Sequence, residues 1–395
     1  MPLALSLLAV AVFAMGTSEF MLAGLLPDIA SSLDVTVGTA GLLTSAFAVG
    51  MIIGAPLMAG LARRWPARNS LLGFVLVFAA VHVVGALTSS FAVLLGTRVV
   101  AAMANAGFLA VALATASALV APDQKGRALA VLLSGTTVAI IAGVPGGAVL
   151  GTVLDWRATF WAIALLCLPA AVGVMQGIPA RTNTSEQDRA TGPALRTELA
   201  QLAQPRLILV MVLAALVNAA TFGTFTFLAP IVTNTAGLAE LWVSIVLVLF
   251  GIGSFLGVRI AGRLSDQRPG QLIAAGGPLV LLGWIALAVL AVHPVALLVL
   301  VLVQGVFSFA LGSTLIARVV YEVSDAPTMG GSYATAALNL GAAGGPVVAA
   351  ATLDTGLGEL GPVWASTLLV AIALSMALPL LRVITPRIAK QETTR

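Results

Sequence analysis

Two stretches of this chain share one pattern, GAPLMAGLARRWP at residues 54–66 and GVRIAGRLSDQRP at residues 257–269. Matching prolines and glycines recur at a constant separation of 203 positions, in the pairs Pro27 and Pro230, Gly50 and Gly253, Gly54 and Gly257, and Pro66 and Pro269. Glycines four positions apart in an apolar helix allow a second helix to approach closely. The pattern therefore predicts a duplicated helical chain with a small-residue face in each copy.

The composition around these stretches is that of a membrane protein. Of the 395 residues, 60% are hydrophobic and 9% are charged, whereas soluble domains carry about 25% charged residues. A helical run of about 20 apolar residues crosses the ~30 Å hydrocarbon core of a bilayer. Such runs are predicted at residues 3–27, 36–61, 70–88, 91–119, 128–151, 157–178, 206–231, 241–262, 271–291, 295–317, 331–352 and 362–384. A soluble enzyme is excluded, and a lipid bilayer is the expected surrounding.

A polar segment divides these twelve runs into two sets of six. Residues 182–188, TNTSEQD, are all polar. We therefore expect an all-α integral membrane protein with an N-terminal six-helix bundle at 1–180, a cytoplasmic linker at 181–205 and a C-terminal six-helix bundle at 206–395. The first run is too long for the core of a signal peptide, so we expect it to remain as the first helix. Two parallel repeats of this kind hold a substrate between them near the membrane midplane, which favours a carrier over a channel.

The basic residues predict the orientation of the chain. When alternate loops are assigned to opposite sides, 17 of the 19 Lys and Arg residues fall on one side, and this excess is typical of the cytoplasmic side. Both termini are expected to be cytoplasmic, with the protein in the plasma membrane of a bacterium. The net charge of +4 is too small and too dispersed for a nucleic-acid partner. Cys167, His82 and His293 are far apart in the sequence, so no metal site and no cofactor are expected.

Two charged residues inside predicted spans stand out, because an intramembrane charge is unfavourable by several kcal/mol unless it is paired or hydrated. Glu19 lies in the first span and Arg98 in the fourth, at similar predicted depths below the outer surface. Burial favours the neutral form of a carboxyl group, whereas a nearby guanidinium favours the charged form. Movement between the two residues could therefore load and unload a proton. The structural alternative for Glu19 is a fixed ion pair or hydrogen bond that only holds helices together.

Other residues in the spans could contact a substrate. Uncharged polar and aromatic side chains suggest a provisional pocket of Phe20, Asn105, Asn218, Phe222 and Asn339. Packing among helices is the alternative for each of them, and for the aromatic rings it is the commoner role. Asp28 is expected in a solvated outer loop, and His82 is expected to pack or to form hydrogen bonds. A part for either in proton coupling stays open.

The repeated stretches resemble the signature of the loop between helices 2 and 3 in major facilitator transporters. Residues 54–72 resemble its first copy, through Arg63, Arg64 and Arg68, and residues 257–270 resemble the second. The first copy departs from the family pattern, because Arg63 stands where the family usually has an acid. Asp266 keeps the acid in the second copy.

Two further stretches resemble signatures of the same family. LLGTRVVAAMANAG at residues 94–107 resembles the helix 4 signature, whose arginine, here Arg98, the family uses in proton coupling. SGTTVAIIAGVPGGAVLG at residues 134–151 resembles the helix 5 signature of antiporters, in which glycine and proline allow the helix to bend and seal against a neighbour. The matching residues are Gly143, Pro145, Gly146, Gly147 and Gly151.

Taken together, the chain resembles the twelve-span drug/proton antiporters, and is most similar to the chloramphenicol exporters of actinobacteria. The resemblance implies a monomeric carrier, not an enzyme, that exchanges protons for a small amphipathic drug, with chloramphenicol as the expected substrate. Export of a sugar or amino-acid metabolite is an alternative, but it would need more polar partners within the spans. A membrane-embedded enzyme or a channel is the alternative from another class. An enzyme would need a cluster of catalytic residues that the sequence does not display.

Overall fold

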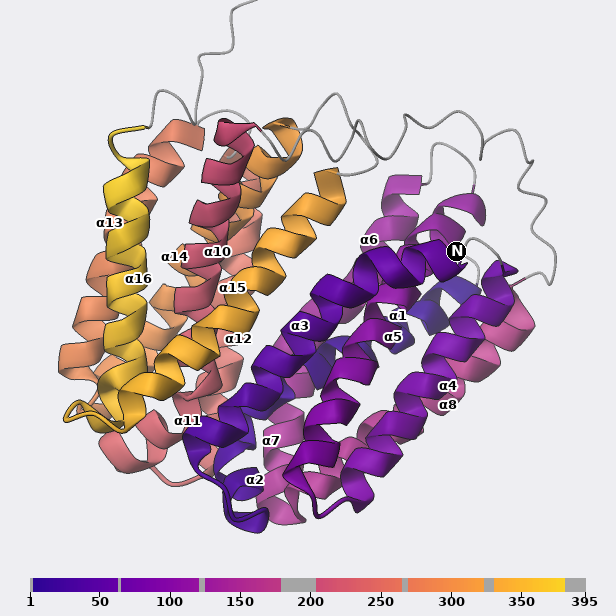
Figure 1. The fold of residues 1–395 in the computed structure, drawn as a ribbon, viewed down its shortest axis with the longest axis horizontal. Coiled ribbons are helices and arrows are strands. Elements are labelled where there is room, and N and C mark those ends of the chain that lie inside the picture. Colours follow the sequence, from indigo (N-terminus) through magenta and orange to yellow (C-terminus); the bar gives the residue numbers. More distant parts are fainter. Residues whose placement is uncertain are drawn as a thin grey trace, which may run out of the picture.

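A computed structural model describes residues 3–62, 65–120, 125–178, 204–264, 269–322 and 330–380. Over these residues the chain is helical and contains no strand. Twelve of the described helical segments are long and apolar enough to cross a membrane, which confirms the predicted fold class. Figure 1 shows the helices of the two halves side by side.

The helices of the first half run from Leu3 to Gly177. They are α1 (Leu3–Phe20), η1 (Met21–Gly24), α2 (Leu26–Ser32), α3 (Val37–Ala62), α4 (Ala67–Leu87), α5 (Phe91–Ala118), α6 (Lys125–Val138), η3 (Ala139–Gly143), α7 (Val144–Val153) and α8 (Trp156–Gly177). The second half contains α10 (Pro205–Thr226), α11 (Leu228–Pro230), η6 (Ile231–Thr235), α12 (Leu241–Leu264), α13 (Pro269–Leu290), α14 (Pro294–Glu322), α15 (Gly330–Leu353), η7 (Gly358–Leu360) and α16 (Gly361–Ala377).

The two halves repeat the same helix contacts. In the first half α3 packs against α5 and α1 against α6, and in the second half α12 packs against α14 and α10 against α15. The predicted small-residue faces lie where α3 meets α5 in the first half and where α12 meets α14 in the second half. A Cβ atom would collide with the neighbouring helix at all four glycines, namely Gly50 against Val99, Gly54 against Met103, Gly253 against Leu302 and Gly257 against Val306. These glycines therefore allow close approach in both halves, as their spacing predicted.

Three of the predicted spans are broken where a single helix was expected. Residues 3–27 form α1 and then the 3₁₀ turn η1, before α2 begins at Leu26. The fifth span contains the π turn η3, and the seventh ends in the π turn η6. Pro145 accounts for the break in the fifth span, because its ring lacks an N–H and would crowd the carbonyl of Ile141 in a regular α-helix. The wider π turn accommodates this defect.

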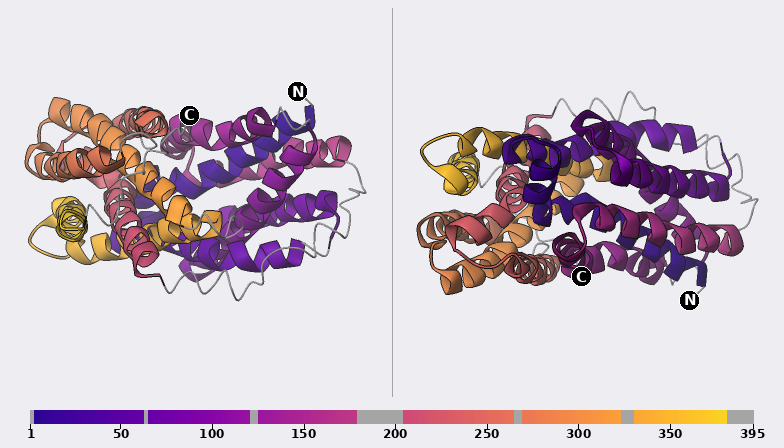
Figure 2. Two further views of the ribbon diagram at one scale, coloured as in Figure 1. Left: turned by 90° about the horizontal axis from the view of Figure 1, so that it is seen from above. Right: turned by 90° about the horizontal axis from the view of Figure 1, so that it is seen from below.

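Contacts between the halves hold them together at one edge of the bundle. Helix α3 packs against α15, and α12 packs against α7 and η3. A Cβ on Gly38, in the first turn of α3, would lie 3.6 Å from side-chain atoms of Ala350 and Leu353 in the last turn of α15. The first turn of α3 and the last turn of α15 lie at the same, lower edge of Figure 1. Figure 2 shows the halves at opposite ends of the long axis in both views.

The outer surface of the bundle carries large apolar side chains. Leu165, Leu168, Leu282, Val295 and Leu368 are each more than half exposed. An apolar surface of this extent is unfavourable in water and suits contact with lipid chains.

Candidate functional site

Glu19 lies at the end of α1, next to the break at η1. Its side chain is half-buried, and its Oε2 atom lies 3.5 Å from Nδ2 of Asn105 in α5. The same amide nitrogen lies 3.7 Å from the sulfur of Met51 in α3. Asn105, chosen from the sequence as a pocket residue, therefore sits between the carboxylate and a thioether. Side chains from three helices of the first half thus meet around Asn105.

Arg98 is buried, with 1% of its surface exposed. Its Nη1 atom donates to Oγ of Ser18 at 2.8 Å, and its Nη2 atom donates to the main-chain oxygen of Ser18 at 2.7 Å. The guanidinium carbon lies 4.5 Å from the centre of the Phe47 ring, within range of a cation–π interaction. No ion pair joins Arg98 to Glu19 in this structure, whereas the hydrogen-bond form of the structural alternative is represented by the 3.5 Å contact from Asn105 to Glu19.

His82 extends the hydrogen bonds of Arg98 into α4. Its ring is 2% exposed, with Nδ1 at 2.7 Å from the carbonyl oxygen of Phe78 and Nε2 at 2.7 Å from Oγ of Ser18. His82 therefore forms hydrogen bonds, as its sequence context predicted. Ser18 is not among the residues that the sequence pattern singles out, although it directly precedes Glu19 in GTSEF, residues 16–20.

Aromatic rings from the two halves meet next to Glu19. The rings of Phe20 and Phe222 stack across the interface, with centroids 5.6 Å apart and planes inclined by 24°. On the side of the second half, ring contacts continue from Phe222 to Phe225, Phe250 and Phe309. The structure thus brings together two of the aromatic residues that the sequence suggested for a pocket.

The other two amide residues of the suggested pocket have partners within their own half. Nδ2 of Asn218 donates to the carbonyl oxygen of Leu338 at 2.6 Å. Nδ2 of Asn339 donates to the carbonyl oxygen of Thr335, one turn earlier in α15, at 2.9 Å. The Asn218 bond joins α10 to α15, whereas the Asn339 bond stays within α15, and the side-chain oxygen atoms take no part in either bond.

The helix 5 glycines face different neighbours. A Cβ would collide with Thr17 at Gly143 and with Leu25 at Gly151, and at Gly147 it would lie 2.9 Å from Cγ2 of Thr159. Gly146 is exposed and would meet nothing within 4 Å. The expectation that Gly146 packs closely is therefore wrong. It points about 100° away from Gly147 around the helix axis, because successive helical residues differ by this angle.

The residues of the loop signature lie mostly outside the described part of the chain. Arg63, Arg64 and Asp266 fall outside the described ranges, as does most of the predicted linker. Arg68 lies in the first turn of α4 and is half-buried.

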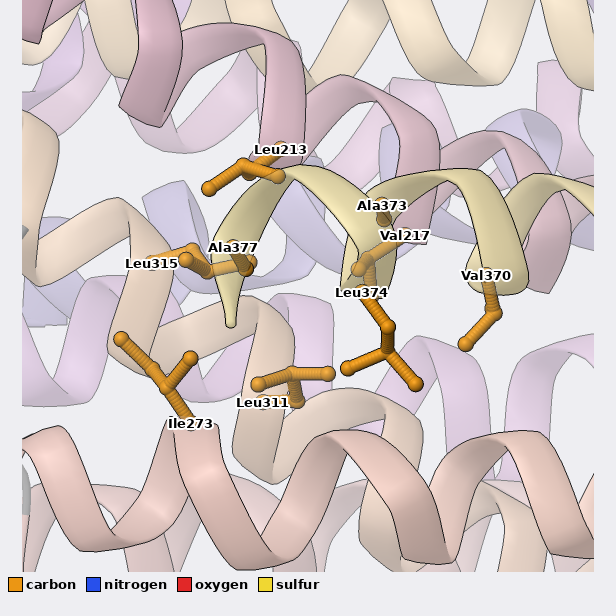
Figure 3. A pocket seen from close by; sticks show the side chains of 9 residues that line it. All are labelled: Leu213, Val217, Ile273, Leu311, Leu315, Val370, Ala373, Leu374 and Ala377. Atoms are coloured by element: carbon orange, nitrogen blue, oxygen red, sulfur yellow. The ribbon is translucent and has the colours of Figure 1, made fainter. Parts of the chain in front are cut away.

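Two cavities lie within the second half, away from Glu19. The first has only apolar side chains from α10, α13, α14 and α16 around it (Figure 3). The second is lined by Thr224, Phe225, Leu228, Phe250, Trp284, Leu287, Val301 and Gln304. An amphipathic molecule needs both apolar surface and polar partners, so the first cavity does not suit one.

Comparison with known proteins identifies the family of the chain. The profile of the Major Facilitator Superfamily matches residues 8–346. The chain is 70% identical over 385 residues to a chloramphenicol resistance protein of Streptomyces lividans, covering 98% of each chain. It is 30% identical to the inner membrane transport protein YdhP of Escherichia coli strain K12, covering 89% of each.

Among solved structures, the fold is similar to that of a bacterial homologue of the human lysosomal transporter Spinster, crystallised in an inward-facing and occupied conformation. The TM-score is 0.75 at 18% identity, and the match covers 96% of both chains. The family match, the relatives and the twelve apolar helices lead to one conclusion. The chain belongs to the major facilitator superfamily and is a multi-pass membrane transporter, not an enzyme.

Proposed function

We propose that this chain exports chloramphenicol in exchange for protons. The observation that carries the proposal is the 70% identity, over nearly the full length, to a protein named for chloramphenicol resistance. The Glu19 carboxylate beside an aromatic pair at the interface is consistent with it. Glu19 is the proposed proton carrier, and Arg98 is the cation that responds to its charge.

The proposed binding region lies between the halves, at Phe20 and Phe222. Chloramphenicol is a neutral molecule with a nitrophenyl ring, two hydroxyl groups and an amide. An aromatic ring gains ~0.5–1.5 kcal/mol from a stacked or edge-on neighbour beyond the area it buries. Asn105 offers a polar partner near the same place. The aromatic pair therefore matches the nitrophenyl ring of the drug, and the Asn105 amide matches its hydroxyl and amide groups.

The transport cycle follows from alternating exposure of this region. With both termini in the cytoplasm, as the basic residues predict, the edge at which Gly38 meets Leu353 is the outer edge. This conformation is then sealed outside, and the drug enters from the cytoplasm. Rocking of one half against the other carries the site to the outer side. The proposed working unit is a single chain.

A resistance test decides the proposal. The chain would be expressed in a drug-sensitive bacterial strain, and growth would be measured against a panel of chloramphenicol, other antibiotics and cationic dyes. Resistance to chloramphenicol and few other compounds supports the proposed substrate. Equal resistance to cationic dyes would point to a multidrug pump, and absence of resistance at matched protein levels would point to a metabolite exporter. Either result would overturn chloramphenicol as the dedicated substrate.

A further inference from the structure

With a neutral His82 ring, the hydrogen bonds between Arg98, Ser18 and His82 can run in only one direction. The carbonyl oxygen of Phe78 can only accept, so Nδ1 of His82 carries the proton and Nε2 has a free lone pair. Ser18 must then donate its hydroxyl hydrogen to Nε2. Since a guanidinium can only donate, Arg98 donates to Oγ of Ser18. Each group in the chain of bonds thereby fixes the orientation of the next one.

Arg98 also stabilises the place where α1 ends. Its second bond goes to the main-chain oxygen of Ser18, two residues before α1 gives way to the 3₁₀ turn η1. Helix ends leave carbonyl groups without their usual partners, and a charged donor is a favourable substitute. The guanidinium is thus attached to the segment that carries the proposed proton site.

Ser18 and Glu19 offer Arg98 acceptors in different directions. They are consecutive residues of α1, so their side chains leave the helix about 100° apart. The guanidinium places one N–H from each of its two terminal nitrogens on Ser18, and its Nε has no partner among the described residues, so no donor of Arg98 reaches the Glu19 carboxylate. In the structure Arg98 is on Ser18, and Glu19 is without its ion pair.

We propose that Ser18 and His82 are positioning residues, which hold Arg98 away from Glu19 and thereby set how readily Glu19 takes up a proton. The inference rests on the proposed function, in which Glu19 carries the proton. If His82 became protonated, Nε2 would no longer accept from Ser18, so the neutral ring is part of the arrangement.

Few other charges face Arg98. The helices that pack against α5 are α1, α3, α4 and α6. Within the spans of these helices the ionisable groups are Glu19 and His82, and α3 has none. The remaining charges, Arg68, Lys125 and Arg127, lie in the first turns of α4 and α6. Ser18 and His82 are therefore the groups through which the position of the guanidinium can be changed selectively.

The test measures binding of radiolabelled chloramphenicol to the purified full-length protein across a range of pH. In an antiporter the drug and the proton compete, so binding falls as Glu19 becomes protonated. Ser18→Ala removes the hydroxyl that accepts from Arg98 and leaves the bond to the main-chain oxygen, so the guanidinium can turn toward Glu19, where its positive charge favours the ionised carboxylate. The pH at which half of the binding is lost should then fall by about one unit, a tenfold change in proton affinity.

Paired variants separate positioning from packing. His82→Leu removes the acceptor for Ser18 and should shift the midpoint in the same direction, whereas His82→Gln can retain an acceptor and should lie nearer the unmodified protein. Ser45→Ala is the matched control, because Ser45 is buried and its hydroxyl has no partner among the described residues. Its midpoint should not move. If Ser18→Ala does not yield a monodisperse protein, the two His82 variants decide the question alone.

Glu19→Gln separates the proposed role of Glu19 as proton carrier from the proposed positioning role of Ser18 and His82. It should make binding independent of pH over this range, and a retained midpoint would contradict Glu19 as the proton carrier. If Glu19→Gln removes the pH dependence while Ser18→Ala and His82→Leu keep the original midpoint, the positioning role is overturned and the proposed function stands.

Discussion

At the scale of single residues, the site combines a buried cation with a carboxylate that is not paired to it. A buried arginine without any partner would be strongly destabilising. Here Ser18 and the ring of Phe47 supply the stabilisation that an ion pair would otherwise give. The carboxylate of Glu19 is left to interact with Asn105 and with whatever enters the interface. This division of partners is what a proton carrier needs.

The first prediction concerns Glu19. Glu19→Gln imitates the protonated side chain, so at every pH it should bind chloramphenicol only as weakly as the protonated transporter does, and it should not use a proton gradient. Uphill export from proteoliposomes should fall below about a tenth of the normal rate, while exchange of drug for drug continues. Asp354→Asn, a change of the same type at an exposed position, should leave both rates unchanged. Normal uphill export by Glu19→Gln would rule out this residue as the carrier.

At the scale of elements, two neighbouring glycines of the fifth span, Gly146 and Gly147 in α7, can be tested as a pair. Gly147→Leu would force its side chain against Thr159, whose hydroxyl donates to the carbonyl of Gly147 at 2.8 Å. Overpacking of this kind typically destabilises by ~1–3 kcal/mol. We expect transport to fall at least tenfold, with a membrane that leaks protons because the helices no longer seal. The measurement is drug export together with proton leak in vesicles.

Gly146→Leu is the control for that experiment. Gly146 is one residue away in the same helix, but its Cβ would meet nothing within 4 Å. Export should stay within about twofold of the normal rate. Equal losses at both positions would show that helix 5 is sensitive to bulk in general and not to its contact with α8.

Asp28, at the outer end of the first half, predicts that pH affects how tightly the two halves stay together at that end. Burial raises the pKa of Asp28 in α2, and the negative charges of Glu240 and Asp155 raise it further. Glu240 belongs to the second half, so its effect is strongest while the halves are together at this end. The proton is therefore bound more tightly in the sealed state, and lowering the outside pH should favour that state.

Spin labels can measure this equilibrium. With labels on cysteines introduced at Ser31 and Ala239, in a Cys167→Ala background, the short-distance population should increase from pH 8 to pH 5. Asp28→Asn should reduce the increase, and Asp34→Asn, a second acid at the same end, should not. A pH response that survives Asp28→Asn unchanged would assign the effect to another group.

The sequence predicted the elements better than their contacts. Span lengths and the Gly50 and Gly54 face follow from hydropathy and spacing, which are local properties. The partners of Arg98 could not be predicted in this way, because Ser18 is 80 positions from it and His82 is 64 positions from Ser18. The break at η1 and the direction of Gly146 likewise depend on how helices pack. Glu19 stands out in the sequence because a carboxylate in an apolar run is unusual whatever its partners, and its role stays a prediction.

At the scale of the whole molecule, the charge on the transported species decides what drives export. Chloramphenicol is neutral, so each turnover that returns protons should carry net positive charge inward. A unit charge that moves through 100 mV contributes about 2.3 kcal/mol, which sustains roughly a fiftyfold drug gradient if one proton moves and coupling is tight. Export should therefore respond to the membrane potential as well as to the pH gradient.

Proteoliposomes without a pH difference test this prediction. A potassium-diffusion potential, negative on the cytoplasmic face of the transporter, should drive chloramphenicol to the opposite face. The Glu19→Gln variant in the same vesicles should show no such accumulation, because it has no titrating carboxylate to couple charge to the drug. If the potential has no effect while a pH gradient alone drives full transport, the exchange is electroneutral. A second charge would then have to accompany each drug molecule, which a single carboxylate at the interface could not supply.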